Sequence, residues 1–525
     1  MTTYNETAIS EQDPLSAPAR PLPSKAGARE WLGLALLSLP TVLLGLDLTL
    51  LHLALPALAA DLRPTSTEAL WIMDAYGFMI AGFLITMGTL GDRIGRRRLL
   101  MIGAAAFGVT SIIAAFSTNA PMLIAARAAL GVAGATLMPS TLALISNLFA
   151  DPRQRALAIG VWATTFALGM AAGPIVGGVL LEHFWWGAGF LVAVPIVVLL
   201  LLLAPVLLPE YRARQSDRID LFSAALSLAA MLPVIYGIKE IAKEGLALTS
   251  IATIVAGILF GLLFAWRQRR LADPLLDLDL FASRAFSVAL VVLLFGLVAV
   301  GGTMLLVTQY LQLVAGFSPL VAGLWMGPPA LAMVAAGIGT PLLARYVRPG
   351  FVVAGALALS VAGYLMLTWL KNDASGLVMV VAGFSLAYLG LGTIAALGTD
   401  LVVGSAPVEK AGSASAMSET VQELGASLGI ALLGSITTAI YRQTMQDRLP
   451  DDLSPEVQAA VGDSLWAASA MAQRLPAGLL EDAQSSFIAG FNTAAAFSAA
   501  SIAILAVLAG VALRKIPTLN AASQE

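Results

Sequence analysis

The chain alternates between long apolar runs and short polar segments. Fourteen of the apolar runs approach or exceed the roughly 20 residues that an α-helix needs to cross the hydrocarbon core of a membrane. They predict transmembrane helices at 31–58, 68–90, 98–116, 121–148, 155–181, 187–208, 219–240, 248–267, 284–313, 319–344, 350–370, 376–402, 411–441 and 487–513. The fold class that this pattern predicts is an all-α membrane protein with fourteen transmembrane helices.

Composition agrees with this fold class and excludes several chemistries. The 525 residues are 58% hydrophobic and only 12% charged, a balance that no soluble domain needs. Cysteine is absent, which excludes disulfides, thiolate metal sites and a cysteine nucleophile. The two histidines, His52 and His183, are too few for a histidine-based metal centre. We therefore expect neither a metal nor a cofactor.

The charges in the loops predict the orientation. Of the 29 Lys and Arg residues, 21 fall on the side of the N-terminus, 7 on the other side with Lys239 among them, and Arg127 lies within a run. Because Lys and Arg accumulate in cytoplasmic loops, both termini are predicted to be cytoplasmic. Residues 1–30 are polar and contain prolines, and we interpret them as a disordered cytoplasmic tail rather than a signal peptide.

The loop between the second and third runs combines small residues with charges. Its sequence "GTLGDRIGRRR" contains Gly88, Asp92, Arg93, Gly95 and Arg96. Small residues let two helix ends approach closely, and the charges supply ion pairs that can form and break. This pattern predicts a conformational gate. The alternative is that any tight cytoplasmic loop is rich in Gly and Arg for reasons of topology alone.

Three ionisable residues lie at comparable depth in the first, second and fourth runs. They are Asp47, Asp74 and Arg127, and charges within a membrane span usually face a shared cavity or one another. We expect them to face one cavity, and the alternative is a static ion pair of Arg127 with Asp47 or Asp74. His52 follows Asp47 in the same run, either as its proton-relay partner or as an ordinary interfacial histidine.

The thirteenth run carries two carboxylates on one helix face. Glu419 and Glu423 are four residues apart, and two such groups in an apolar setting can hold a proton between them. The alternative for Glu419 is solvation at the cytoplasmic interface. The remaining polar candidates are interpreted as interfacial or structural: His183, Asp220, Asp277 and Asp279.

Four strings together resemble a known family. "GTLGDRIGRRR" is similar to the signature loop of the major facilitator superfamily, and "LIAARAALGVAGA" resembles its fourth-helix element with Leu130 in place of the usual Gln. "LDLTLLHLALP" resembles the first-helix element of the fourteen-helix drug:proton antiporters, with His52 where Asn is usual. "GMAAGPIVGG" resembles the fifth-helix motif of drug antiporters, and its motif residues are Gly169, Gly173, Pro174, Gly177 and Gly178. The resemblance extends over the whole chain and is to multidrug exporters typified by SmvA, LfrA and QacA.

This resemblance implies an architecture. Two six-helix bundles, 31–210 and 273–525, are expected to be related by a pseudo-twofold axis, with the site between them at the membrane midplane. Two additional linker helices are expected at 211–272. An outer loop at 442–486 belongs to the second bundle, and Val457, Val461 and Leu465 suggest a short amphipathic helix in it that covers the surface.

The resemblance also implies a function. It is proton-coupled export of lipophilic cations such as quaternary ammonium compounds, dyes, chlorhexidine or fluoroquinolones, by a monomer in the bacterial inner membrane that binds no nucleic acid. Drug and proton would compete for Asp47, Asp74 and Glu423, with Glu419 as a fourth carboxylate and Arg127 and His52 beside them. Trp71, Tyr76, Trp325 and Met326 are candidates for the apolar wall of the site.

Three other functions compete with this prediction. A proton-coupled solute symporter shares the fold, but its site is expected to carry more cationic residues than Arg127 alone. A membrane enzyme would need a catalytic motif, and the chain has no nucleotide loop, HExxH or GxSxG. A sensor or channel would lack coupling between proton and solute.

Overall fold

The computed structural model describes residues 26–149, 151–211, 220–271, 274–405, 411–450, 453–514, 516 and 518. Within these residues the secondary structure is entirely helical, and fourteen helical segments are long and apolar enough to cross a membrane. The predicted number of spans is therefore confirmed, and the chain is a multi-pass membrane protein. Most of the predicted tail lies outside the described residues, but its last part is helical, because the first helix begins at Ala28.

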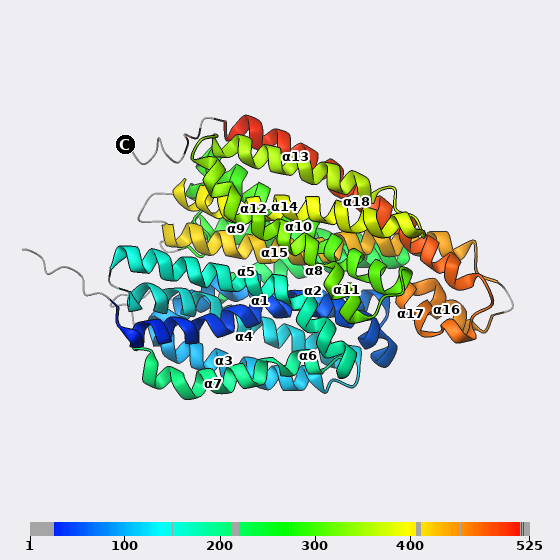
Figure 1. Cartoon of the computed structure of the whole chain (residues 1–525), viewed down its shortest axis with the longest axis horizontal. Coiled ribbons are helices and arrows are strands. Elements are labelled where there is room, and N and C mark those ends of the chain that lie inside the picture. Colours follow the sequence, from blue (N-terminus) through cyan, green and yellow to red (C-terminus); the bar gives the residue numbers. More distant parts are fainter. Residues whose placement is uncertain are drawn as a thin grey trace, which may run out of the picture.

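The first seven helices form one bundle, shown from blue to green in Figure 1. Their bounds are α1 (Ala28–Leu62), α2 (Ser66–Ile94), α3 (Arg96–Ala115), α4 (Ala120–Leu148), α5 (Pro152–His183), α6 (Ala188–Leu191) and α7 (Ala193–Leu207). Local sequence fixes where they start. At α2, for example, the Thr65 side chain accepts from the backbone N–H of Glu68 while the Glu68 carboxylate accepts from the backbone N–H of Thr65.

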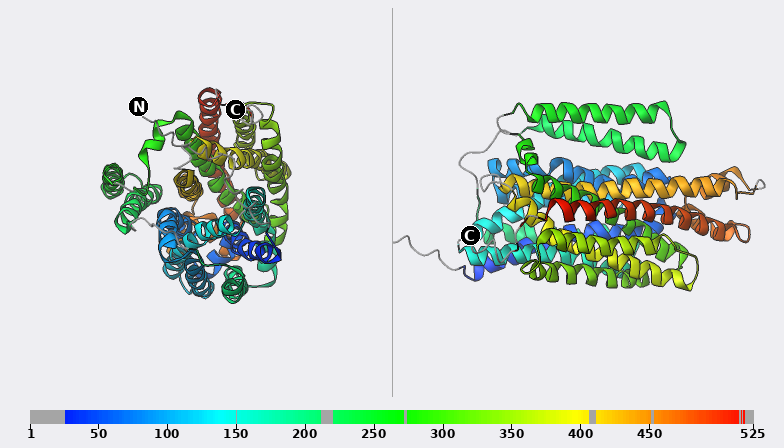
Figure 2. Two further views of the ribbon diagram at one scale, coloured as in Figure 1. Left: turned by 90° about the vertical axis from the view of Figure 1, so that its left-hand side faces the viewer. Right: turned by 90° about the horizontal axis from the view of Figure 1, so that it is seen from above.

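Two helices then form a separate pair. They are α8 (Leu221–Glu244) and α9 (Leu248–Gln268), which pack on each other and lie at the periphery of the molecule in Figure 2. The surface of α9 is rich in exposed apolar side chains, as expected for a helix that faces lipid: Ile251, Val255, Ile258, Leu259 and Leu262. The other helix, α8, packs on both α2 and α15, one helix from each bundle.

The remaining helices form a second bundle. Their bounds are η1 (Leu278–Ala282), α10 (Arg284–Gln309) with a π-helical end η2 (Tyr310–Val314), α11 (Pro319–Trp325), α12 (Gly327–Ala344), α13 (Pro349–Leu367), α14 (Ala374–Gly404), α15 (Ala411–Gln446), α16 (Pro455–Asp463), α17 (Leu465–Ala470), η4 (Ala472–Arg474) and α18 (Leu479–Ala512). The predicted span 319–344 is divided into α11 and α12 at Met326. Two prolines follow directly after Gly327, and they cannot donate backbone hydrogen bonds to the preceding turn.

Each bundle has its own apolar core. One buried cluster is built almost entirely from residues of α1 to α7, and the other almost entirely from residues between Leu280 and Leu513. A third, small cluster of Phe78, Ile235 and Ala431 joins α2, α8 and α15. The seam between the bundles is therefore covered by α8 at the place where α2 meets α15.

Both described ends of the chain lie on one side of the molecule, as Figure 1 shows. We call this side the terminal side and the opposite side, which carries α16 and α17, the far side. The predicted short helix of the far-side loop is present as α16, where Val461 is fully buried. It ends at Asp463, because Ser464 adopts an extended backbone, so Leu465 belongs to the next helix, α17.

Candidate functional site

The predicted gate loop joins α2 to α3 on the terminal side. Gly95 connects the two helices with a φ of 114°, a conformation that L-residues with side chains rarely adopt. A Cβ at this position would also collide with the carboxylate of Glu210, which follows α7. Glu210 accepts a hydrogen bond of 3.1 Å from the backbone N–H of Arg97. The loop is therefore fastened to the end of α7 within the first bundle.

The charges of this loop also pair locally. Arg96 Nη2 lies 2.6 Å from Asp92 Oδ1, one helical turn away, and Arg96 Nη1 donates to the carbonyl of Pro139 on α4 at 3.4 Å. Arg93 is exposed. Gly88 makes only an ordinary contact, since a Cβ there would lie 3.8 Å from Pro139. The structure thus brings Asp92 and Arg96 together and leaves Gly88 and Arg93 apart from them.

The glycines of the fifth-helix motif pack α5 against α1. Cβ atoms at Gly169 or Gly173 would collide with the Val42 carbonyl or the Thr49 side chain, and one at Gly177 would lie 2.9 Å from Leu50. These positions are four residues apart and share one face of the helix. The predicted close packing of the motif is therefore present.

The same motif also contacts the second bundle. A Cβ at Gly178 would lie 2.7 Å from the carbonyl oxygen of Pro319, the first residue of α11. A Cβ at Gly323 of α11 would collide with the carbonyl oxygen of Pro174. Helix α5 is thus held by α1 on one face and by α11 on another, and α11 belongs to the second bundle.

Asp47 and Arg127 form a buried ion pair inside the first bundle. Arg127 Nη1 lies 2.7 Å from Asp47 Oδ2, and Arg127 Nε donates to the carbonyl of Ile72 at 3.2 Å. The guanidinium also lies over the ring of Tyr76, 4.5 Å from its centroid. The side chain of Arg127 is 2% exposed and that of Asp47 is 13% exposed. Of the alternatives for these charges, a direct pair of Arg127 with Asp47 is the arrangement in this structure.

Asp74 does not join that pair, which corrects the prediction that the three charges face one cavity. Arg127 contacts Ile72 and Tyr76, and Asp74 is two residues from each of them. Two residues correspond to a rotation of about 200° around an α-helix, so Asp74 faces away from Arg127. Its partner is Lys239 of α8, whose Nζ lies 2.8 Å from Asp74 Oδ2 and 3.0 Å from Oδ1. Both side chains are fully buried.

Lys239 lies at the end of the predicted span 219–240 and its charge was assigned to the outer side; it is the main polar residue that sequence reasoning missed. The seventh run ends in "YGIKEIAKEG", a polar string that is typical of a membrane interface. In the structure α8 continues to Glu244, so Lys239 lies more than a turn inside the helix. The sequence did indicate a cation beside α2, because Trp71 and Asp74 are three residues apart and share a helix face that suits a cation. It did not indicate which cation binds there.

Glu423 lies on α15 where this helix touches α2. It is 7% exposed, and its Oε2 atom is buried without a hydrogen-bond partner in the part of the chain that the structure describes. A Cβ at Gly77 would lie 3.6 Å from the Glu423 carbonyl, so the two helices meet closely here. Glu423 is within electrostatic range of Asp47 and Glu419. The structure therefore brings carboxylates of the two bundles near each other.

The two histidines differ in their surroundings. His52 is 5% exposed, and neither of its ring nitrogens has a hydrogen-bond partner among the described residues. It is thus buried within the protein, and it makes no hydrogen bond with Asp47, the partner predicted for a relay, among the described contacts. His183 is exposed at the far end of α5, with Nδ1 3.0 Å from the Val179 carbonyl, as an interfacial histidine would be.

The four predicted wall residues separate into two groups. Tyr76 and Trp71 are ring partners of Arg127 and Lys239. Trp325 and Met326 lie at the end of α11 instead. Trp325 is 38% exposed and stacks on Phe317 at the molecular surface, so it does not line the region between the carboxylates, and Met326 is buried in the core of the second bundle.

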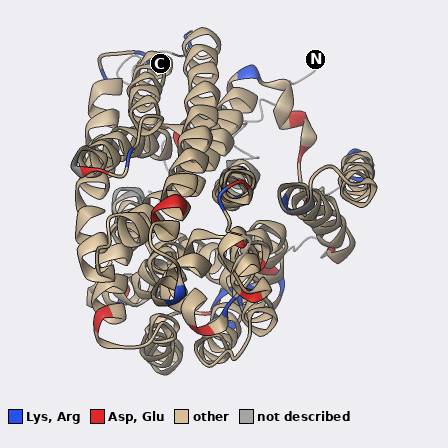
Figure 3. Cartoon of the chain, turned by 90° about the vertical axis from the view of Figure 1, so that its right-hand side faces the viewer, with Lys and Arg blue, Asp and Glu red and all other residues tan. Residues whose placement is uncertain are grey.

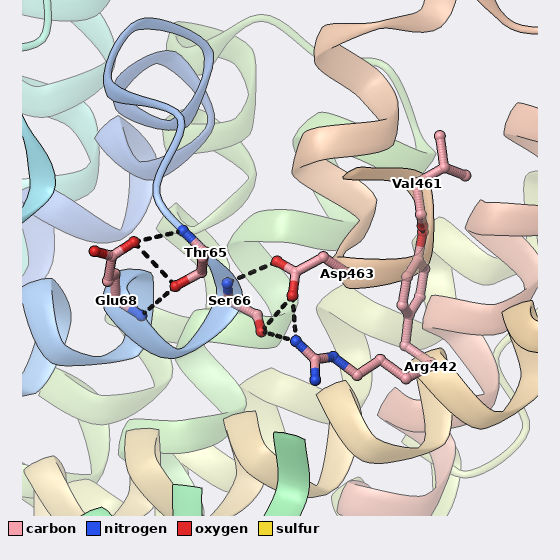
Figure 4. Close-up of polar contacts among 7 residues, drawn as sticks. Thr65, Ser66, Glu68, Arg442, Val461 and Asp463 are labelled. Atoms are coloured by element: carbon pink, nitrogen blue, oxygen red, sulfur yellow. Dashed lines mark hydrogen bonds and ion pairs between the residues drawn. The ribbon is translucent and has the colours of Figure 1, made fainter. Parts of the chain in front are cut away.

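Polar contacts link the bundles at the far side (Figure 4). The Asp463 carboxylate accepts from the backbone N–H of Ser66 at 2.7 Å and from its hydroxyl at 3.1 Å, at the first turn of α2. Arg442 of α15 forms an ion pair with Asp463 and donates to the Ser66 hydroxyl at 3.1 Å. We call Ser66, Arg442 and Asp463 the far-side bridge.

The carboxylates predicted to be structural act at helix ends. Asp220 caps α8 by accepting from the backbone N–H of Ser223, and Arg267 of α9 lies 2.9 Å from it. Burial alone would raise the pKa of Asp220, but the hydrogen bonds from Ser223 and Arg267 outweigh it and lower the pKa. Asp277 accepts from the backbone N–H of Asp279 at the start of η1.

Among the described residues, potential metal ligands are dispersed. In the ranges that the structure describes, no three His, Asp or Glu side chains gather in a group that could hold a metal ion. Viewed from the far side in Figure 3, charged residues are few and scattered over a mostly uncharged ribbon. The candidate site is a set of ionisable side chains between helices.

Comparison with known proteins identifies the family. The sequence matches the Major Facilitator Superfamily over residues 37–430. It is 42% identical to the multidrug efflux pump LfrA of Mycolicibacterium smegmatis, over 94% of this chain and 98% of that protein. It is 36% identical to the methyl viologen resistance protein SmvA of Salmonella typhimurium, over 91% of this chain and 97% of that protein. A tetracenomycin C resistance and export protein of Streptomyces glaucescens is 31% identical, over 92% of this chain and 91% of its own.

Solved structures agree on the fold. A bacterial homolog of the human lysosomal transporter Spinster, in an inward-facing and unoccupied conformation, matches with a TM-score of 0.66 at 15% identity, covering 93% of this chain and 98% of that one. A peptide transporter of the POT family in complex with sulfate matches with a TM-score of 0.62 at 15% identity, covering 92% and 95%. The chain is therefore a transporter rather than an enzyme, and it belongs to the Major Facilitator Superfamily, in the family of these multidrug efflux and resistance proteins.

Proposed function

We propose that this protein exports lipophilic cations from the cytoplasm in exchange for protons. Support for the substrate class comes from relatives named for multidrug efflux and for resistance to methyl viologen, which is an organic dication. Support for the direction comes from the loop charges, because with Lys239 counted inside α8 the sequence assigns 21 Lys and Arg residues to the side of the termini and six to the opposite side. The terminal side is then cytoplasmic and the far side is the side of release.

The observation that carries this proposal is the buried carboxylate of Glu423. Its Oε2 atom has no hydrogen-bond partner within the described ranges, at the contact between α15 and α2. An intramembrane carboxylate in apolar surroundings is costly and is stabilised when it binds either a proton or an organic cation. Both ligands cannot occupy it together, so one displaces the other.

We propose that Glu423 and Asp47 together bind the exported cation. Asp47 retains Arg127 as a partner, which holds its carboxylate in a fixed orientation while Glu423 exchanges ligands. Protonation of Glu423 from the far side then lowers the affinity for the cation and releases it. Glu419, one turn away on the same helix, and Tyr76, which is within electrostatic range of both acids, complete the polar lining.

Alternating access would expose this region to one side at a time. The α2–α3 loop, with Gly88, Asp92, Arg93, Gly95 and Arg96, is proposed as the cytoplasmic gate, since its Asp92–Arg96 pair can be remade with other partners as α2 moves. The proton gradient supplies the driving force, so no cofactor is required. The protein is proposed to act as a monomer in the bacterial inner membrane.

Proton release on drug binding tests this proposal. We expect purified wild-type protein in weakly buffered detergent to release protons when tetraphenylphosphonium is added. Glu423→Gln should abolish the release, while Asp47→Asn should weaken cation binding at least tenfold. Asp447→Asn, which changes an exposed carboxylate at the end of α15, is the matched control and should behave as wild type.

Two results would contradict the proposal. Cation binding by the wild type without proton release would remove proton competition. Uptake of a neutral or anionic solute together with protons, in vesicles that do not export the cation, would favour the symporter instead.

A further inference from the structure

The contact between α2 and α8 has the composition of a site for an organic cation. Asp74 and Trp71 lie nearly one turn apart on α2, and the ammonium of Lys239 lies against both. Its Nζ is 2.8 Å from the Asp74 carboxylate and 3.8 Å from the centroid of the Trp71 ring. A carboxylate combined with an aromatic face is the usual means by which proteins bind alkylammonium groups. We call Asp74 and Trp71 the α2 cation box.

The box lies at the seam between the bundles. The small cluster of Phe78, Ile235 and Ala431 brings α2, α8 and α15 together beside it. Trp71 packs on this cluster with further apolar side chains, which are Met231, Leu232, Leu424 and Leu428. Leu424 is the neighbour of Glu423 in the chain. The box and Glu423 are therefore separated by one apolar helix face that includes Leu424. A lipophilic cation moving between them contacts these apolar side chains.

Stability alone does not account for this pair. Removing two charges from water costs several kcal/mol for each ion, and replacing a buried pair with apolar residues is often neutral or stabilising. Helix α8 also has apolar contacts that hold it on α2 and α15. Lys239 carries its charge on a flexible stem, five residues before the end of α8 at the far side. Its ammonium can therefore withdraw from the box and extend toward water.

We propose that Lys239 is a tethered cation that competes with the exported cation for the α2 cation box. This inference rests on the proposed function, because it takes an organic cation as the substrate. When the exported cation enters the box, Lys239 withdraws toward the far side. When the cation leaves, Lys239 returns, and the Asp74 carboxylate is never left without a positive charge. Lys239 thus limits affinity and promotes release.

Binding of tetraphenylphosphonium to the full-length protein tests the inference. Lys239→Met removes the competitor, so we expect the Kd for this cation to fall at least fivefold. The Kd of triphenylphosphine oxide, an uncharged ligand of similar shape, should change less than twofold. In proteoliposomes, KM and kcat for the cation should both fall, because binding is tighter and release is slower. A merely structural role of Lys239 would not produce this split.

Three further variants make the test specific. Lys239→Arg keeps the charge and should bind within twofold of wild type. Lys239→Gln removes the charge but still donates a hydrogen bond to Asp74, so it replaces Lys239→Met if that variant does not fold. The double variant Asp74→Asn/Lys239→Met should lose the whole gain in affinity. Unchanged or weaker cation binding by both Lys239→Met and Lys239→Gln would overturn the inference.

The outcomes separate this inference from the proposed function. If the wild type exchanges the cation for protons and neither neutral variant binds more tightly, the inference alone fails. If the variants bind more tightly while the wild type releases no protons, the inference stands and proton coupling fails.

Discussion

The two ends of the molecule are held by different kinds of contact. At the far side, the bundles are joined to each other by Asp463 of the outer loop bound to Ser66 of α2, and by α5 pressed against Gly323 of α11. At the terminal side, the charges of the α2–α3 loop find partners inside the first bundle, as in the pair of Asp92 with Arg96. Among the described polar contacts, those of Asp463 cross the seam at the far side, while those of the α2–α3 loop stay within the first bundle.

This difference indicates which contacts change during transport. A contact across the seam must break whenever the bundles separate at that end, whereas a contact within one bundle can persist through the whole cycle. Substitutions at the far side should then shift the balance between conformations. Substitutions at a contact within one unit and away from the proposed gate, such as the pair of Asp220 with Arg267 in α8 and α9, should change stability and leave that balance alone.

The largest effect is expected at the contact between α5 and α11. A Cβ on Gly323 would collide with the carbonyl oxygen of Pro174, so Gly323→Leu should prevent closure at the far side and reduce cation efflux at least tenfold. The helix itself should tolerate the change, because leucine has a higher helix propensity than glycine. Efflux from proteoliposomes, with thermal unfolding measured alongside, checks this result.

Gly339→Leu is the matched control for that variant. A Cβ at Gly339 has no neighbour within 4 Å in the described structure, so efflux should stay close to wild type. Equal efflux by the two leucine variants would show that the α5–α11 contact does not limit closure.

A smaller effect is expected from the far-side bridge. Asp463→Ala removes the acceptor for Ser66 and the partner of Arg442, which should cost the closed far side about 1–2 kcal/mol, or roughly a tenfold shift toward opening. Because the chain has no cysteine, Leu70→Cys introduces a single thiol at a buried position that lines a small pocket beside Asp463. Its labelling by a membrane-impermeant thiol reagent should become about tenfold faster in the Asp463→Ala background.

Glu456→Ala on the same outer loop provides the comparison for this variant. Glu456 is exposed on α16, and its removal should leave the labelling rate unchanged. The bridge would have no role in closure if the two backgrounds were labelled at the same rate.

The sequence predicted the helices well because the membrane imposes one strong rule. A span needs an apolar run of fixed length, and this rule identified all fourteen spans among the described residues. Close packing through one face of α5 was also predictable, since Gly169, Gly173 and Gly177 recur every four residues, although the sequence did not name α1 as the partner. In both cases the pattern lies within a single helix and can be read locally.

Contacts between distant segments could not be predicted in the same way. Asp74 and Lys239 are 165 positions apart, and Ser66 and Asp463 are 397 positions apart. The depth of Asp74 was clear, but its direction was not, because Asp74 and Tyr76 point to opposite faces of α2. Choosing between them requires knowing which helix packs on each face, and that is set by the assembly of the bundles.

The smallest effect is expected from an ion pair within the separate helix pair, between Asp220 of α8 and Arg267 of α9. Asp220→Asn keeps the N-cap of α8 but removes the charge, which should lower the free energy of unfolding by about 0.5–1 kcal/mol at pH 7 and leave efflux unchanged. The pKa of Asp220 is lower in the folded protein, so its contribution is complete above the unfolded value of about 3.9 and is lost as the pH falls through the folded pKa. Thermal unfolding in detergent at pH 7, 5 and 3.5 should show wild type and variant converging only at the lowest pH. A constant difference in stability at all three pH values would mean that the charge of Asp220 does not stabilise the start of α8. A loss of efflux in the variant would mean that a contact within the α8–α9 pair does take part in the transport cycle.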